Sequence, residues 1–422
     1  MYGTFRQSRF TYGHVVAEDE LRLLRPLPSR SDSPSFLVLK VRRSAAPKYT
    51  AVSYTWGDEQ PSRFVYLDGK QFPVRRNLWS LLHYLSPVAL AQDRHWDYLW
   101  VDAICINQDD DSERAAQVSR MDQTYRNATC VSVWLGLPSI PSELFTLHPS
   151  SEPINTLEVD MYDWEDSMED LANRPYWSRF WVIQESLLGQ DVELYCSNTR
   201  MNWADFKDIL CRVAGVDQYG DSPYSTENTG SRAFGAFPLV MGRHIDKHPE
   251  YLQPLHDLII DHRHSKCKEP RDRVFALIGL TTQDEQGLLR RVFPDYRMPE
   301  DHVLVYTLAH VMQYGPLIAI QREQGLITVK SDDLFQGLGV TGDYQRRKKL
   351  LRQAKALDYL SGESAEELQY MLALHDDDFS PYDEDDNVEP AANKGWARGK
   401  FARGVVLMII VVIAISLWVR NG

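Results

Sequence analysis

Two apolar runs separated by a helix-patterned stretch form the clearest pattern in this chain. Leu99–Asp110 reads LWVDAICINQDD and Cys130–Gly136 reads CVSVWLG, so each begins with an apolar run of strand length. Between them, over residues 112–126, apolar side chains recur at helical spacing and would share one side of a helix. These side chains are Ala115, Val118, Met121 and Tyr125. The order of strand, helix and strand predicts a βαβ unit in an open parallel sheet, where ligands bind at the carboxyl ends of the strands.

Other strands and turns are predicted on the amino-terminal side of this unit. Phe36–Val41 is apolar and predicts an edge strand, and Tyr49–Tyr54 alternates and predicts a strand that ends at a Gly57–Asp58 turn. Phe64–Val74 predicts a hairpin, because Asp68–Gly69 supplies a two-residue turn that tolerates positive φ. We expect Asn77 to cap a helix with one apolar stripe. That stripe consists of Leu78, Leu81, Leu82 and Leu85.

The net charge of −13 comes mostly from one segment near the end of the chain. Residues 358–390 contain twelve acidic side chains and no Lys or Arg, whereas residues 346–355 carry six basic ones. The rest of the chain is close to neutral, which argues against a nucleic-acid partner. The five cysteines have no paired spacing, and the first residues do not form a signal peptide, so we expect a reducing, cytosolic compartment.

The segment Gly404–Val419, GVVLMIIVVIAISLWV, contains no charged residue and predicts a membrane-spanning helix over residues 401–420. At about 1.5 Å per residue it is somewhat short for the hydrocarbon core, and a buried terminal helix is the alternative. Four basic residues precede the segment and Arg420 alone follows it, so the body of the chain should face the cytosol. The prediction is a single-pass tail anchor in an organelle membrane that the sequence does not name.

Several polar residues lie near the predicted strand ends and are candidates for ligand binding. Asp102 falls inside the predicted strand Trp100–Ile106, where its carboxylate needs a donor partner and could be either structural or functional. Asp109–Asp111 could cap the next helix instead of binding a ligand. We select Asp58, Asp102, Asn107, Gln108 and Asp109, with Glu113 close to them. His262, His264 and Cys267 lack a fourth ligand, so no metal site is predicted.

Three ordered blocks resemble the heterokaryon-incompatibility (HET) domain. They are YTAVSYTWGDE (Tyr49–Glu59), the run Leu99–Gly136, and RPYWSRFWVIQE (Arg174–Glu185). A weaker similarity to the helical extension of such proteins follows at Glu269–Leu280 and Pro294–Tyr296. The resemblance implies fungal self/non-self recognition and programmed cell death.

The third block is also similar to a helix of Toll/interleukin-receptor (TIR) domains. There an aromatic residue precedes an NAD-cleaving glutamate by four positions, as Trp181 precedes Glu185 here. The pattern departs at Ser178, which stands one residue farther from the acid, and at Val182, where a cysteine is usual. The resemblance implies that Glu185 could be catalytic, with NAD as a substrate and no resident cofactor. The alternative is a structural ion pair of Glu185 with Arg174 or Arg179.

These observations predict an α/β fold with a TIR/flavodoxin-like parallel sheet. The expected parts are an N-terminal extension (1–48), a HET domain (49–190), a mainly helical extension (191–345), a charged linker (346–395) and the anchor (401–420). The first hypothesis for function is a membrane-anchored signalling protein that acts by self-association or by binding a protein partner. The second is a NAD glycohydrolase, and the third is a membrane-tethered protein that keeps only the HET scaffold.

Overall fold

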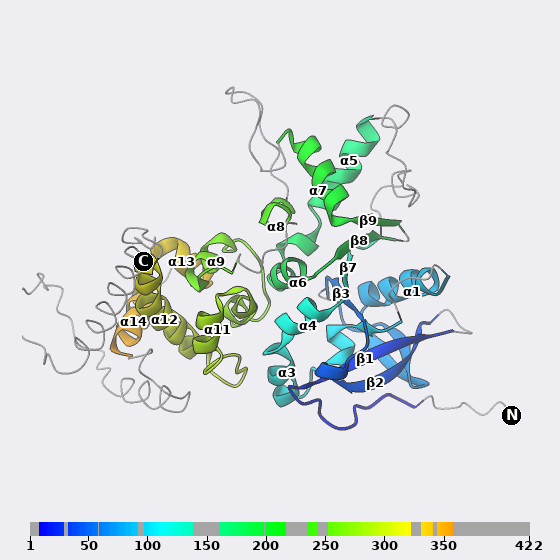
Figure 1. Ribbon diagram of the computed structural model, residues 1–422, viewed down its shortest axis with the longest axis horizontal. Coiled ribbons are helices and arrows are strands. Elements are labelled where there is room, and N and C mark those ends of the chain that lie inside the picture. The colour runs from blue at the N-terminus through cyan, green and yellow to red at the C-terminus, as the bar shows by residue number, and fades with distance from the viewer. Residues whose placement is uncertain are drawn as a thin grey trace, which may run out of the picture. The chain divides into compact units, whose positions relative to one another are not determined.

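The computed structural model describes residues 8–28, 33–57, 59–91, 97–137, 161–197, 199–216, 235–242, 252–321, 331–340 and 344–357 (Figure 1). Within them, the strands form one nine-stranded sheet of order β5-β4-β2-β1-β6-β3-β7-β8-β9. The strands are β1 Glu20–Leu27, β2 Ser35–Arg42, β3 Thr50–Tyr54, β4 Arg63–Leu67, β5 Lys70–Val74, β6 Leu99–Trp100, β7 Cys130–Trp134, β8 Val192–Cys196 and β9 Thr199–Asn202.

The helices divide between the sheet region and a later helical region. Those connecting the strands are α1 Arg76–Ala91, α2 Asp102–Cys105, α3 Asp111–Val118, α4 Met121–Asn127, α5 Met161–Ala172, the 3₁₀ helix η3 Pro175–Ser178 and α6 Val182–Leu188; η1 Arg43–Ala45 follows β2. Later come α7 Trp203–Ala214, α8 Phe237–Gly242, α9 Leu255–Asp261, α10 Asp272–Phe275, η4 Ile278–Leu280, α11 Gln283–Leu289, α12 Glu300–Gln321, α13 Ser331–Gly337 and α14 Tyr344–Ala356. The predicted mainly helical extension, 191–345, begins with the sheet strands β8 and β9, and its other described elements, from α7 onward, are helices.

The centre of the sheet is parallel, as the α/β prediction requires. β3 pairs in parallel with β6 on one side and with β7 on the other, and β7 pairs in parallel with β8. The predicted strands Leu99–Trp100 and Cys130–Trp134 therefore flank β3 and do not pair with each other. Every residue of β3 and β7 is buried. In Figure 1, α4 and α6 lie on one side of β3 and α1 lies on the other; burial on both faces is what parallel strands need.

The hairpin and the apolar stripe are confirmed, whereas two other N-terminal predictions are wrong. β4 and β5 pair antiparallel through Asp68–Gly69, both at positive φ. The four stripe leucines are buried. β2 is not an edge strand, because it lies between β1 and β4. Asn77 lies inside α1 and is not its cap; its side chain donates to the Thr55 carbonyl and accepts from the Trp134 indole, at 2.7 and 2.9 Å.

The predicted strand Trp100–Ile106 is wrong beyond Trp100. The carbonyl of Val101 accepts the amides of Ile104 and Cys105, at 3.0 and 2.7 Å, and closes the short helix α2. Asp102 thus begins a helical turn directly after β6, where an acidic side chain is favourable. The apolar run Ala103–Ile106 fits a strand and a helical turn equally well, because a buried turn of helix is as apolar as a buried strand.

The single helix expected over 112–126 is two helices, α3 and α4, separated at Ser119–Arg120. The Ser119 hydroxyl donates to the Ala116 carbonyl at 2.8 Å, and Arg120 has a non-helical backbone. Such local side-chain bonds compete with helix continuation. Of the predicted apolar side, Met121 and Tyr125 are buried, whereas Ala115 and Val118 are only half-buried, and the fully buried side chains of α3 are Glu113 and Gln117.

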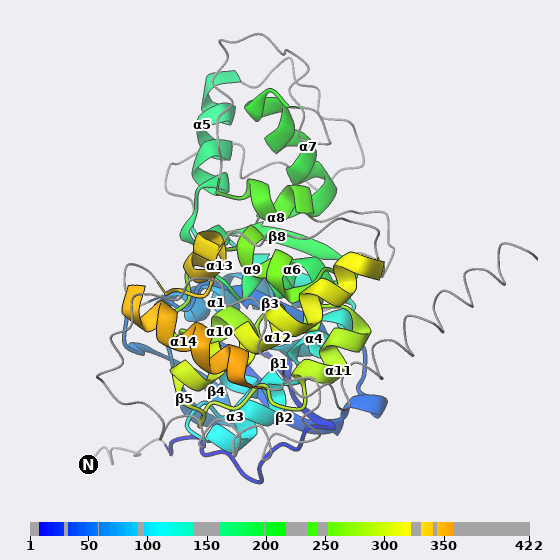
Figure 2. The same cartoon turned by 90° about the vertical axis from the view of Figure 1, so that its left-hand side faces the viewer.

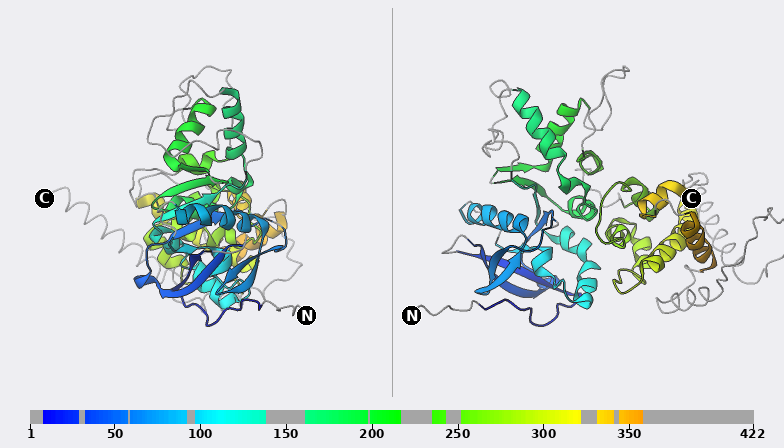
Figure 3. Two further views of the ribbon diagram at one scale, coloured as in Figure 1. Left: turned by 90° about the vertical axis from the view of Figure 1, so that its right-hand side faces the viewer. Right: turned by 180° about the vertical axis from the view of Figure 1, so that it is seen from behind.

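The helical region contacts the same side of the sheet as α4 and α6. η4 contacts both of these helices. Figure 2 shows α9, α11 and α12 in front of the sheet, and the right-hand view of Figure 3 shows the same helices beside it. Gly279 in η4 makes this approach possible, since a Cβ there would lie 2.3 Å from Asp122 Cβ and from Gln184 Nε2. No helix in the part of the chain that the structure describes is long and apolar enough to cross a membrane. The predicted loop over 139–160, the acidic segment and the anchor Gly404–Val419 lie outside that part.

Candidate functional site

The strand order reverses next to β3, and this reversal locates the candidate site. After β3 the parallel strands continue with β6 on one side, and then with β7 and β8 on the other. Ligands of open α/β sheets bind outside the carboxyl ends of the strands at such a reversal. The carboxyl end of β3 carries Ser53 and Tyr54, with Trp56 just beyond the strand.

Glu185 lies beneath this end of the sheet, on α6. Glu185 is 1% exposed, and the Ser53 hydroxyl donates a hydrogen bond to its carboxylate. The Tyr176 and Ser53 hydroxyl oxygens are 2.7 Å apart, so the η3 helix supports the same contact. The Arg179 guanidinium is 3.9 Å from the carboxylate and also donates to the Tyr54 carbonyl. Of the two predicted ion-pair partners, Arg179 is therefore close to Glu185.

Burial dominates the electrostatics of Glu185. Loss of solvent raises its pKa to about 7, and the charge of Asp102 acts in the same direction. Arg179 and the Ser53 hydroxyl lower the pKa, but they do not compensate for the burial. A carboxyl group that titrates near neutral pH can exchange a proton under physiological conditions.

Asp102 is a second buried carboxylate at this end of the sheet. Its Oδ2 accepts the Trp56 indole N–H at 2.7 Å, and its Oδ1 accepts the Ala103 amide at 2.7 Å. The predicted donor partner is thus present. Burial raises the pKa of Asp102, while the charge of Arg179 and these hydrogen bonds lower it. The charge of Arg179 thus lowers the pKa of both carboxylates.

The remaining predicted ligand-binding residues lie mainly in the segment between α2 and α3. The Gln108 side chain donates to the Asp102 carbonyl at 3.0 Å, and the Asn107 amide donates to Glu113 at 2.7 Å. Asp109 is exposed, and Asp110 caps α3 by accepting the amides of Ser112 and Glu113. Helix capping is therefore confirmed for this acidic run. Asp58 lies outside the described residues.

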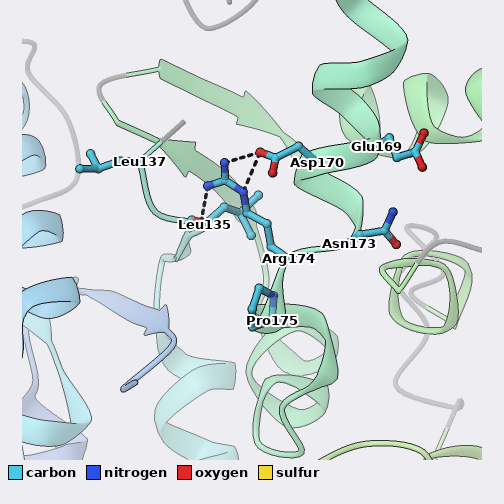
Figure 4. A pocket seen from close by; sticks show the side chains of 7 residues that line it. All are labelled: Leu135, Leu137, Glu169, Asp170, Asn173, Arg174 and Pro175. Carbon is cyan, nitrogen blue, oxygen red and sulfur yellow. Dashed lines mark hydrogen bonds and ion pairs between the residues drawn. The ribbon is translucent and has the colours of Figure 1, made fainter. Parts of the chain in front are cut away.

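Arg174 does not pair with Glu185. Its guanidinium contacts the Asp170 carboxylate and donates to the Leu135 carbonyl. This arginine forms the wall of a pocket of about 460 Å³ at the carboxyl end of β7 (Figure 4). The pocket is lined by Leu135, Leu137, Glu169, Asp170, Asn173, Arg174 and Pro175. The pocket does not include Glu185, but Tyr176, which contacts Ser53, follows Pro175 directly in the chain.

Sequence reasoning misses Ser53 and Tyr176, the two hydroxyl residues of the site. The available signal for Ser53 is its place in a fully buried strand, where a hydroxyl needs a partner. Tyr176 carries no comparable signal, because an aromatic residue in an apolar block is expected in the core. Among the described residues, no group of three or more His, Cys, Asp or Glu side chains is arranged to hold a metal ion.

Comparisons with known proteins agree with the blocks that surround this site. The model of the family described as "Heterokaryon incompatibility protein (HET)" matches residues 49–185, from just before β3 to Glu185 in α6. A curated relative, "Heterokaryon incompatibility protein 6, OR allele" of Neurospora crassa, is 27% identical over an alignment of 392 residues. The alignment covers 78% of this chain and only 57% of the relative.

No solved structure matches this chain. The family match nevertheless starts and ends at the elements that form the site, since β3 supplies Ser53 and α6 supplies Glu185. The chain is therefore a HET domain-containing protein, with the domain at residues 49–185.

Proposed function

We propose that this chain is a signalling protein of heterokaryon incompatibility, in which the HET domain promotes cell death after non-self recognition. The observation that carries the proposal is the HET match over residues 49–185, joined by similarity to a relative named for heterokaryon incompatibility. The domain acts by self-association or by binding a protein partner. Because the chain spans little more than half of that relative, the activity of the whole relative is not transferred.

A fusion assay tests this role. Hyphae of a filamentous fungus that express the chain are fused with hyphae that do not, and uptake of a membrane-impermeant dye is measured. We expect death confined to fused cells and lost when the HET domain is disrupted. Unchanged viability of fused cells with verified expression of a folded chain would contradict the proposal.

We further propose that Gly404–Val419 anchors the protein in a membrane, with the HET domain in the cytosol. Support comes from the uncharged sixteen-residue run and the basic residues before it. Removal of residues 404–422 should convert a carbonate-resistant membrane protein into a soluble one with an unchanged thermal transition. Release of the full chain by carbonate would disprove the anchor.

NAD cleavage is the second candidate function, and the position of Glu185 favours it. The parallel strands follow the order β6-β3-β7-β8, which corresponds to 2-1-3-4 when they are numbered along the chain. This order is found in flavodoxin-like folds, in agreement with a TIR-like sheet. Glu185 lies near the strand-order reversal, and its pKa of about 7 leaves a fraction of the carboxyl group ionised at neutral pH.

In this reaction the ionised Glu185 stabilises an oxocarbenium-like ribosyl centre. The bond between the ribosyl carbon and the nicotinamide nitrogen breaks, and nicotinamide leaves with the bonding electrons. Water adds to the ribosyl carbon and loses a proton, so the products are nicotinamide and ADP-ribose. Since Glu185 is buried, substrate access requires displacement of the chain around it.

Incubation of the purified chain with NAD, followed by detection of nicotinamide, tests this candidate. Glu185→Gln keeps the size of the side chain but removes its charge, so turnover should fall by about 100-fold or more. Turnover of the unaltered chain should rise with pH around 7, as the carboxylate forms. A folded, concentrated chain that releases no nicotinamide would exclude the enzymatic function and leave partner binding.

A further inference from the structure

We propose that the Glu185 site is composite: the segment Lys266–Gly279 of the helical region positions the two HET-domain residues at its centre, Arg179 and Glu185. The inference rests on the proposed function only in its choice of site, because the contacts themselves do not depend on the reaction. Asp272 is the main positioning residue in this segment.

The backbone around Arg179 is held by the helical region. The amide of Phe180 donates to the Lys266 carbonyl at 2.8 Å, and the amide of Lys266 donates to the Ser178 carbonyl at 2.6 Å. These two bonds are placed on either side of Arg179, which pairs with Lys266 as a parallel bridge. The guanidinium that lies near Glu185 is thus carried by a backbone that residues outside the HET domain fix in place.

Asp272 holds the start of the helix that carries Glu185. The Trp181 indole N–H donates to one carboxylate oxygen of Asp272 at 2.8 Å, and the Tyr296 hydroxyl donates to the other at 2.8 Å. The Arg114 guanidinium lies 4.5 Å from the Tyr296 ring centroid, so a second HET-domain residue supports the same contact. Trp181 is one turn before Glu185, and a shift of its ring would move the helix.

The outer side of α6 is closed by η4. Gln184, next to Glu185, is 2% exposed, and Gly279 approaches it so closely that no side chain fits between them. Arg126 of α4 donates to the Gly279 carbonyl at 2.9 Å and holds the loop in this position. The helical region thus covers α6 at the residue next to Glu185. The burial that controls the protonation of Glu185 therefore depends on both regions.

The test follows the Glu185 carboxyl group itself, and not a biological activity. Glutamate carboxyl carbons of the full chain are isotope-labelled and titrated by NMR, with the Glu185 resonance assigned by its absence from Glu185→Gln. Asp272→Asn removes the negative charge of the group that accepts the Trp181 indole N–H, so this hydrogen bond should weaken. We expect its Glu185 titration midpoint to fall by at least one pH unit toward that of an ordinary glutamate.

Glu285→Gln is the matched control. Glu285 is a buried carboxylate of the helical region that bonds the Leu255 amide and His310, both within that region. The Glu285→Gln variant should destabilise the helical region yet leave the titration midpoint of Glu185 unchanged. An unchanged midpoint in Asp272→Asn, or an equal shift in Glu285→Gln, would overturn the proposal.

Trp181→Phe covers the case in which Asp272→Asn does not fold. It removes the indole N–H and keeps an aromatic ring, and we expect a midpoint shift in the same direction. An unchanged midpoint in this variant would also overturn the proposal. Because no step of the experiment uses NAD or cell death, these results are independent of whether the proposed function is correct.

Discussion

Two glutamates of the HET domain, Glu113 and Glu185, are each 1% exposed, yet their surroundings differ in kind. Glu113 accepts hydrogen bonds from the two terminal guanidinium nitrogens of Arg22, at 2.7 and 3.1 Å, and from the backbone amides of Val16 and Asn107. Glu185 has the Ser53 hydroxyl and an arginine at 3.9 Å. The two carboxylates are thus equally inaccessible to solvent but differ greatly in how far their charge is compensated.

The consequence is opposite shifts of the two pKa values. Burial acts to raise the pKa of Glu113, but the Arg22 side chain and the two amides outweigh burial and lower it. Burial raises the pKa of Glu185 to about 7. A fully paired carboxylate has a structural role, whereas a poorly paired one near a strand-order reversal is suited to chemistry or to a switch. The difference predicts three results.

The largest effect is expected at Glu113. Glu113→Gln removes the partner of a buried arginine and should lower the free energy of unfolding by about 3–5 kcal/mol. Denaturant unfolding at pH 7 measures this loss. Glu20→Gln is the control, because its pair with Lys40 is exposed to solvent and should contribute far less to stability. Equal losses in the two variants would show that Glu113 is not specially paired.

The pH dependence of stability should differ between the two glutamates. The folded chain holds the Glu185 proton more tightly than the unfolded chain, so this residue stabilises most below pH 4.5. That contribution, about 3 kcal/mol from the size of the shift, is lost as the pH rises to about 7. Glu113 has the lowered pKa, and its contribution is lost in acid.

Unfolding free energies of Glu185→Gln and the unaltered chain at pH 5, 6, 7 and 8 test this sign. The variant should gain stability relative to the unaltered chain as the pH rises through this range. A difference that does not depend on pH would mean that Glu185 is ionised and paired throughout, like Glu113.

A smaller effect is expected at Asp102, whose carboxylate accepts two hydrogen bonds from neutral donors. Asp102→Ala leaves the Trp56 indole N–H without its acceptor and should cost about 1–3 kcal/mol. Thermal unfolding with Trp fluorescence measures this cost. Undiminished stability together with lost activity would instead place Asp102 in the functional site.

Much of the parallel sheet follows from local pattern. Leu99–Trp100 and Cys130–Trp134 are apolar because parallel strands are buried on both faces, and the hairpin turn at Asp68–Gly69 depends only on its own residues. Asp102 shows the limit of such reasoning, since a short apolar run fits a buried helical turn as well as a strand. Likewise, the break at Ser119–Arg120 leaves the helical period nearly intact.

The HET blocks, the parallel centre of the sheet and the choice of Glu185 as a candidate acid follow from the amino-acid sequence, because they depend on short-range order and on residue type. Which arginine lies near Glu185, the chain of contacts from Tyr176 to Ser53 to Glu185, and the bonds of Lys266 and Asp272 to the residues just before Glu185 are visible only in three dimensions. Those contacts join residues up to 132 positions apart. The physical reason is that charge compensation depends on distance and burial in three dimensions, neither of which a local pattern contains.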